Sequence, residues 1–252
     1  MRKILALMVV VVGLGLMPTL SNAGSTKPFT ATAVQKMQDK EVQGGKIFVS
    51  AQGTRFEFSE YGRDLVQIIL PKQKIMRILF PKDKVYMEMP APADTLVISS
   101  NSNSPCPPIT AMTCKKLGVD KFGEMNVERW SQSIQGLRGE STLWWDPERK
   151  MIMRQEYPDG RIMQLQLAGK EDLGGRKTER WDISYAQPGR PVLTGLRMVD
   201  TDLGIIVKEQ LPSGLVRELR DLKAAKVDPK WFAVPKDYKR IETPKAAPAP
   251  QQ

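Results

Sequence analysis

The sequence predicts a mainly β protein built around one curved antiparallel sheet. Between residues 29 and 89, runs of five to eight residues alternate between apolar and polar positions, and turn residues such as Gly44-Gly45, Gly53 and Pro81-Lys82-Asp83 separate them. In the second half, short motifs recur at nearly constant spacing without a break in composition. These observations together favour a single sheet over two domains.

The first 23 residues have the pattern of a secretory signal peptide. Arg2 and Lys3 precede an uncharged run over residues 4–16, and Ser21-Asn22-Ala23 places small residues at the expected cleavage site. Extended to Leu20, the apolar run reaches about 17 residues, short of the roughly 20 that a membrane-spanning helix needs. We therefore expect cleavage after Ala23 rather than an uncleaved anchor, and export to a bacterial periplasm.

Composition excludes several classes of site. The 252 residues carry 38 Lys+Arg and 28 Asp+Glu, a net charge of +10 that becomes +8 once Arg2 and Lys3 are removed with the signal peptide. There is no histidine, which removes the commonest general base and the commonest metal ligand. The two cysteines are too few for an iron–sulfur cluster or a Cys-rich zinc site.

Cys106 and Cys114 enclose a short loop. In an oxidising compartment such a pair is expected to form a structural disulfide, and its spacing lacks the CxxC pattern of redox catalysts. A reactive or metal-binding pair remains the alternative.

The first half predicts six strands. Phe29 to Ala33 favours a first strand, although residues 32–40 are also compatible with a helix. Each of the next five runs has one apolar face and one mixed face, which specifies its register. These five runs are residues 47–51, 55–59, 66–70, 76–80 and 85–89.

The second half contains a repeat. Glu128-Arg129-Trp130 recurs 51 residues later as Glu179-Arg180-Trp181, and Glu156–Gly160 resembles Gln210–Gly214 at an offset of 54. We match Leu117-Gly118, before the first copy, with Leu173-Gly174 before the second. Two copies are too few for a solenoid, so they are interpreted as successive strand groups of one sheet.

The remaining segments are not predicted to be strands. Residues 90–108 are rich in Pro, Ser and Asn and are expected to cross an open end of the sheet. Asp228 and Pro229 predict a single helical turn. Residues 24–243 then form one domain, followed by a disordered Ala/Pro/Gln tail over residues 244–252.

Several motifs resemble the periplasmic lipoprotein-carrier superfamily of LolA and LolB, and most closely its exported domains of unknown function. They span most of residues 29–241, and they are Gly45–Val49, Arg55–Glu57, Pro81–Tyr86, Trp144–Asp146 and Trp231–Tyr238. The resemblance implies a LolA-like incomplete β-barrel, a curved half-barrel sheet with few short helices whose hollow holds acyl chains. It also implies that Arg55 corresponds to an arginine that helps gate the family's lid. The chain departs from LolA in lacking clear lid helices and in carrying Cys106 and Cys114.

The predicted function is non-enzymatic binding of a lipid, or of the acyl chain of a lipidated protein, on the concave face of this sheet. Each methylene buried there contributes about 0.8 kcal/mol. The segment from Pro90 to Cys114 is the expected lid. The alternative is that the same side chains simply form a dry core. The expected ligand-binding residues are Phe56, Phe58, Ile68, Leu70, Ile78, Phe80, Met87 and Met89.

Three other functions were weighed. Met87-Glu88-Met89 and Met151-Ile152-Met153 could each present two thioethers to Cu(I). The carboxylate pairs Glu148/Glu156 and Asp200/Asp202 could serve acid–base catalysis. The fold could also be an envelope interaction or sensor module, whose basic surface favours anionic membranes or acidic partners. We expect no catalytic residue, no metal, no cofactor and no nucleic acid.

Overall fold

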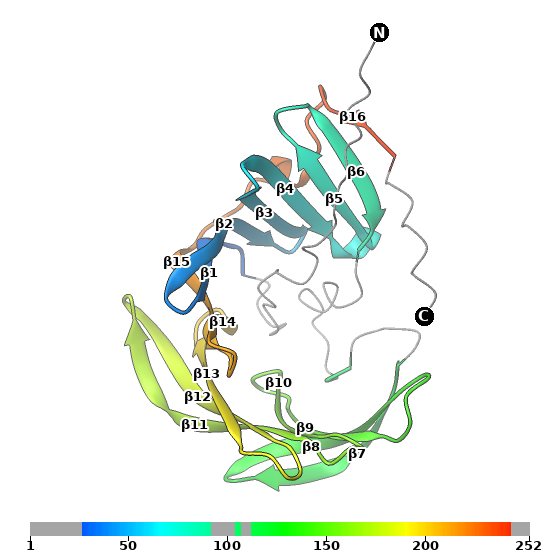
Figure 1. Cartoon of the computed structure of the whole chain (residues 1–252), viewed down its shortest axis with the longest axis vertical. Coiled ribbons are helices and arrows are strands. Elements are labelled where there is room, and N and C mark those ends of the chain that lie inside the picture. Colours follow the sequence, from blue (N-terminus) through cyan, green and yellow to red (C-terminus); the bar gives the residue numbers. More distant parts are fainter. Residues whose placement is uncertain (1–26, 92–103, 107–111, 243–252) are drawn as a thin grey trace.

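The computed structural model describes residues 27–91, 104–106 and 112–242. The predicted signal peptide, the tail over residues 244–252 and most of the segment from Pro90 to Cys114 lie outside these residues. The described chain forms one large curved sheet of 16 strands that is not closed into a barrel (Figure 1). The expected open, curved, mainly β fold is therefore confirmed.

Successive strands pair as neighbours within β1 to β6 and within β7 to β15, and these two groups meet where β1 pairs with β15. The first-half strands are β1 (Phe29–Met37), β2 (Lys40–Ser50), β3 (Gly53–Glu60), β4 (Arg63–Leu70), β5 (Ile75–Phe80) and β6 (Val85–Pro90). The second-half strands are β7 (Met112–Phe122), β8 (Met125–Ile134), β9 (Ser141–Asp146), β10 (Met151–Glu156), β11 (Ile162–Leu173), β12 (Arg176–Ala186), β13 (Leu193–Asp200), β14 (Ile205–Gln210), β15 (Leu215–Ala224) and β16 (Lys239–Arg240).

The spatial order is β16-β6-β5-β4-β3-β2-β1-β15-β14-β13-β12-β11-β10-β9-β8-β7. Neighbouring strands are antiparallel except β16, which pairs in parallel with β6. The five alternating runs of the first half are strands as predicted, in β2 to β6. The helical alternative for residues 32–40 is wrong, because β1 continues to Met37 and turns through Gln38 and Asp39, both at positive φ.

Helical content is small, as expected. In the described part of the chain it consists of short 3-10 turns, among them η1 (Pro71–Gln73) and η3 (Pro229–Phe232). The turn η3 begins as predicted: the Asp228 carboxylate accepts a hydrogen bond from the Lys230 amide at 2.9 Å, and Pro229 occupies the first position. The disulfide between Cys106 and Cys114 is also present, with a Cα–Cα distance of 6.3 Å.

The predicted repeat is a repeat of structure. The four strands β7 to β10 correspond to β11 to β14, so that Trp130 of β8 matches Trp181 of β12. One matched pair was wrong. Gly118 and Gly169 both lie at a register shift, with φ of +152° and +156°, so the counterpart of Gly118 is Gly169, at the same offset of 51 as the Trp pair.

Buried side chains form three clusters. The first lies between β13–β14 and the strands β15, β1, β2 and β3, and includes Phe56 and Leu203. The second lies over β8 to β14 around Trp181. The third holds Phe232 of η3 against β4 and β5. The hairpin β13–β14 serves two clusters, because Met198 and Ile205 belong to the first whereas Val199 and Ile206 belong to the second.

Candidate functional site

Strand pairing decides which of the predicted ligand-binding residues share a face, because directly opposite residues in antiparallel strands point to the same side. Gln67 of β4 pairs with Phe56 of β3 and with Ile78 of β5, and Ile78 pairs in turn with Met87 of β6. Alternation along each strand adds further residues to this side. The residues on this face, called the inner face below, are Phe56, Phe58, Ile78, Phe80, Met87 and Met89.

Ile68 and Leu70 lie on the other side of the sheet, which corrects the expectation of one common face. Ile68 pairs with Arg55 and with Arg77, not with a member of the inner face. Both Ile68 and Leu70 pack against Phe232, in the cluster that the C-terminal segment covers. That segment, orange to red in Figure 1, runs along the outer side of β3 and β4 before reaching β16. The C-terminal segment therefore buries the side chains of Ile68 and Leu70.

Other parts of the chain cover two inner-face residues, Phe56 fully and Phe58 in part. Phe56 is 4% exposed in the cluster closed by the β13–β14 hairpin, and Phe58 packs against that cluster and stacks on Phe56 with ring centroids 4.9 Å apart. For Phe56, as for Ile68 and Leu70, the alternative of a dry core describes what the structure shows, whereas Phe58 stays half-buried.

Four predicted residues remain on the inner face of the strands β5 and β6, and we call them the β5–β6 patch: Ile78, Phe80, Met87 and Met89. Met87 is buried, whereas Ile78, Phe80 and Met89 are half-buried. Ile78 and Met87 are directly paired, as are Phe80 and Val85. The patch is therefore a contiguous apolar surface near the end of the described sheet, where β6 lies between β5 and the two-residue strand β16. Its ligand-binding role stays a prediction.

Arg55, which the resemblance associates with a lid, lies on the outer side. Its Nη1 donates to the Trp231 carbonyl at 2.9 Å, its Nε pairs with Glu57 at 2.7 Å, and its guanidinium lies 5.2 Å from the centre of the Trp231 ring. Trp231 also stacks on Phe48 with centroids 4.8 Å apart. In this structure Arg55 therefore anchors the C-terminal segment to β3.

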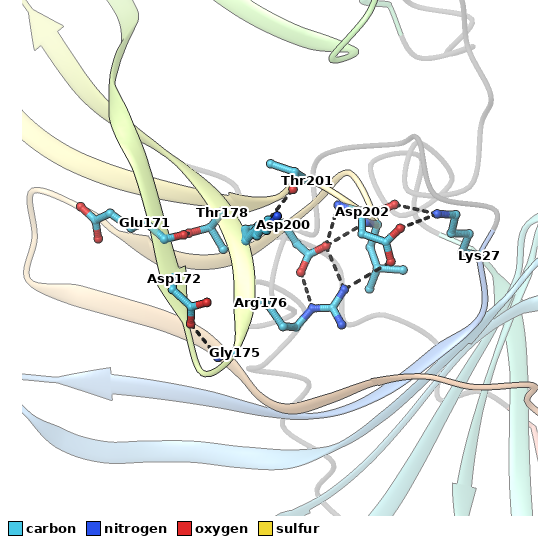
Figure 2. Close-up of polar contacts among 11 residues, drawn as sticks. Lys27, Glu171, Asp172, Gly175, Arg176, Thr178, Asp200, Thr201 and Asp202 are labelled. Atoms are coloured by element: carbon cyan, nitrogen blue, oxygen red, sulfur yellow. Dashed lines mark hydrogen bonds and ion pairs between the residues drawn. The ribbon is translucent and has the colours of Figure 1, made fainter.

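A charged cavity of about 420 Å³ lies between the equivalent turns β9–β10 and β13–β14. Figure 2 shows the ion pairs along one wall, where Arg176 binds Asp200 and Lys27 reaches Asp202 at 2.7 Å. The hydrogen bond from Lys27 lowers the pKa of Asp202 below its ordinary value. The carboxylate of Asp200 also accepts hydrogen bonds from the Asp202 and Leu203 amides, at 3.0 and 2.8 Å.

The other wall has its own ion pairs, centred on Arg149. Arg149 donates to both oxygens of Glu179, at 3.0 and 3.2 Å, and to Asp146 at 2.9 Å. Its guanidinium lies 5.6 Å from the centre of the Trp181 ring. The hydrogen bond to Glu179 raises the pKa of Arg149 further above its ordinary value, so the group stays charged. Asp146 and Asp200 are equivalent, 54 residues apart, and each holds its own turn.

Neither suggested carboxylate pair forms a catalytic arrangement. Asp200 and Asp202 belong to a turn and are neutralised by Arg176 and Lys27. Glu148 precedes β10, whereas Glu156 ends it and pairs with Arg154. Sequence reasoning overlooked Arg149 and Arg176. The sequence signal that could have found their sites is the recurrence of Asp at positions 146 and 200. These positions have the same offset of 54 as Glu156–Gly160 and Gln210–Gly214. Both aspartates are buried in the structure.

A row of polar side chains also crosses the sheet in paired positions on five adjacent strands. Glu209 accepts from Arg197 at 2.7 Å and lies 3.5 Å from Arg217, and both Glu209 and Gln35 are 4% exposed. The row, from β2 to β13, is Gln43, Gln35, Arg217, Glu209 and Arg197. It pairs the buried charge of Glu209 with two cations.

Tyr185 lies near this row and gives a prediction for alkaline pH. Burial raises the pKa of Tyr185, an effect that Arg197 opposes and Glu209 reinforces. The pKa of Tyr185 is higher in the folded protein than in the unfolded chain. Its contribution to the free energy of unfolding is therefore fully present below about pH 10 and is lost as the pH rises through the pKa of the folded protein. Burial also raises the pKa of Tyr157, so we expect the tyrosinate absorbance at 295 nm to show a late-titrating component that Tyr185→Phe reduces but does not remove. An unchanged titration curve in that variant would refute this assignment.

No helix among residues 27–91, 104–106 and 112–242 is long and apolar enough to cross a membrane. A scan against protein-family models found no match, and a search of curated proteins also found none.

Solved structures do match. The chain is similar to a LolA superfamily protein from Nitrosomonas europaea, with 10% identity, a TM-score of 0.41 and coverage of 85% of this chain and 94% of that one. It is also similar to an uncharacterized conserved protein from Thermus thermophilus, with 11% identity, a TM-score of 0.32 and coverage of 86% and 91%. A DUF1329 family protein from Desulfovibrio piger matches with 9% identity, a TM-score of 0.30 and coverage of 83% and 90%. The first of these solved structures belongs to the superfamily that the sequence motifs resemble.

Proposed function

We propose that this protein binds a lipid, or the acyl chain of a lipidated protein, on the β5–β6 patch without catalysing a reaction. The observation that carries the proposal is the difference in burial along the inner face. Phe56 is closed off by the chain itself, whereas Ile78, Phe80 and Met89 keep part of their apolar surface exposed. An alkyl chain that covers this surface removes apolar area from water, which favours binding without any polar contact.

The free energy gained by burying an alkyl chain is large enough for binding. Ten buried methylenes contribute about 8 kcal/mol before the cost of association is subtracted. Met side chains suit such a surface because they are flexible and adapt to ligands of different shape. The disulfide and the leader pattern support a periplasmic location, and the mature charge of +8 favours contact with anionic membrane surfaces.

Ile78→Glu should abolish ligand retention, because it places a charge in the centre of the patch. The measurement is native mass spectrometry of the protein purified from the envelope in which it was expressed, with bound lipid counted per chain. Val192→Glu is the matched control, because Val192 is 56% exposed and lies away from β5 and β6. Circular dichroism establishes that both variants fold. Lipid retained by a folded Ile78→Glu variant would refute the proposal.

One observation favours the interaction module as a second candidate. Val119 is 74% exposed and Leu117 is 44% exposed on β7, one of the two edge strands of the described sheet. An edge strand with exposed apolar side chains can pair with an extended segment of another protein. A wild-type protein that carries no lipid but captures a defined partner, with capture weakened by Val119→Lys, would support this function instead.

A further inference from the structure

The strands β5 and β6 bring three methionines together on the inner face. The sequence shows only the pair Met87 and Met89, which lie two residues apart on β6. Strand pairing adds Met76, which is the direct partner of Met89 across β5 and β6. Directly opposite residues have Cβ atoms about 4.5–5.5 Å apart, and diagonal ones about 7–8 Å. Three flexible thioether side chains therefore start close enough for their sulfur atoms to converge.

The surroundings of these sulfur atoms are apolar and shielded. Met76 is 0% exposed and Met87 is 3% exposed, while Met89 is half-buried and gives the group a partly accessible side. Ile69, on the same side of β4 and paired with Met76, is also buried. A Gln67 amide group donates a hydrogen bond to the Met76 sulfur, which fixes that side chain toward the same face. No acidic side chain is paired directly with any of the three.

The geometry points to a binding site for a soft monovalent cation, Cu(I), formed by the sulfur atoms of Met76, Met87 and Met89. Neutral thioethers are soft ligands that select Cu(I), whereas Zn²⁺, Ca²⁺ and Mg²⁺ prefer imidazole, thiolate or oxygen ligands. Within the described residues no group of three or more His, Cys, Asp or Glu side chains offers a competing metal site.

The second Met-x-Met pair lies in a different setting. Met151 and Met153 are both buried in the cluster around Trp181, against which Met125 and Met163 also pack. In that cluster methionine fills a core, which is its commonest role.

The test is a titration of the full chain with Cu(I) alone, kept reduced with ascorbate without oxygen, in competition with a chromogenic Cu(I) chelator. We expect one Cu(I) per chain. Met76→Leu, Met87→Leu and Met89→Leu should each weaken binding by about tenfold or more, a loss that removing even an outer-shell partner of a metal ligand typically produces. Leucine keeps the volume and apolarity of methionine, so these variants should still fold.

Met112→Leu is the matched control. Met112 is a half-buried methionine on β7 whose sulfur also accepts a hydrogen bond from a glutamine, Gln132, but it is not one of the three. This variant should bind Cu(I) as tightly as the wild type. X-ray absorption of protein labelled with selenomethionine should show selenium as the neighbour of copper. Wild-type affinity in the triple leucine variant, no competition by the wild type, or a copper site without selenium would each overturn the inference.

This inference goes beyond the proposed function and fails separately from it. Met76 is not part of the β5–β6 patch and is fully buried, so lipid retention should persist in Met76→Leu while Cu(I) binding is weakened. Ile78→Glu should have the opposite effect, with lipid lost and the three sulfur atoms still present.

Discussion

Phe232→Ala should lower the free energy of unfolding by about 3–5 kcal/mol, the range found for removing a fully buried aromatic side chain. Phe232 is 1% exposed and is surrounded by Val66, Ile68, Leu70 and Leu79. It is the buried residue of η3, so its loss both opens a cavity and loosens the segment that covers the outer side of β3 to β5. Urea denaturation followed by circular dichroism measures the change.

Lys230→Ala provides the comparison, because Lys230 belongs to the same turn and is exposed. Its effect should stay within about 0.5 kcal/mol, as for most surface substitutions. If Phe232→Ala cost no more than Lys230→Ala, the C-terminal segment would not be part of the cooperative fold, and Ile68 and Leu70 would again be available to a ligand.

Asp200→Ala should have the second large effect, about 3 kcal/mol. Removing one partner of a buried ion pair leaves the other charge uncompensated, which typically costs 3–5 kcal/mol. The side chain of Asp200 is 1% exposed, whereas that of Arg176 is 24% exposed and keeps some contact with water, so the lower end of this range applies. The substitution also deprives the Asp202 and Leu203 amides of their acceptor.

A double-mutant cycle separates these contributions. Arg176→Ala in the Asp200→Ala background should cost much less than in the wild type, because Arg176 has already lost its buried partner and keeps only the exposed Asp202. Asp202→Ala is the exposed control, with a side chain 61% exposed, and should change stability by less than about 1 kcal/mol. Strict additivity of Asp200→Ala and Arg176→Ala would show that the ion pair does not support the turn.

The sequence predicted the strands better than it predicted their faces. Period-two alternation located β2 to β6 because each has a distinct apolar set. It failed in β4, where Ile68, Ile69 and Leu70 are all buried, so the alternation does not say which residues look inward. The deciding information is the pairing of Ile68 with Arg55 and Arg77, together with Phe232 from a segment more than 150 residues away in the chain.

The same limit applies to the candidate site. Met87 and Met89 are visible in sequence as a pair, but Met76 joins them only through the register of β5 and β6. Arg149 and Arg176 were missed because their partners Glu179 and Asp200 lie 30 and 24 residues away. The disulfide and the helical turn at Asp228 were predictable because each depends on a few residues close together in sequence.

The recurrence of β7 to β10 as β11 to β14 suggests how this protein could have grown. A closed barrel fixes its strand number, since an added hairpin must satisfy both seams, but an open sheet has no such condition. A tandem duplication of the gene segment that encodes four strands would therefore lengthen the open curved sheet without disturbing the existing strand pairs. Ancestors with one such unit, and descendants with three, should be foldable, and each copy would bring its own buried aspartate to hold the new corner.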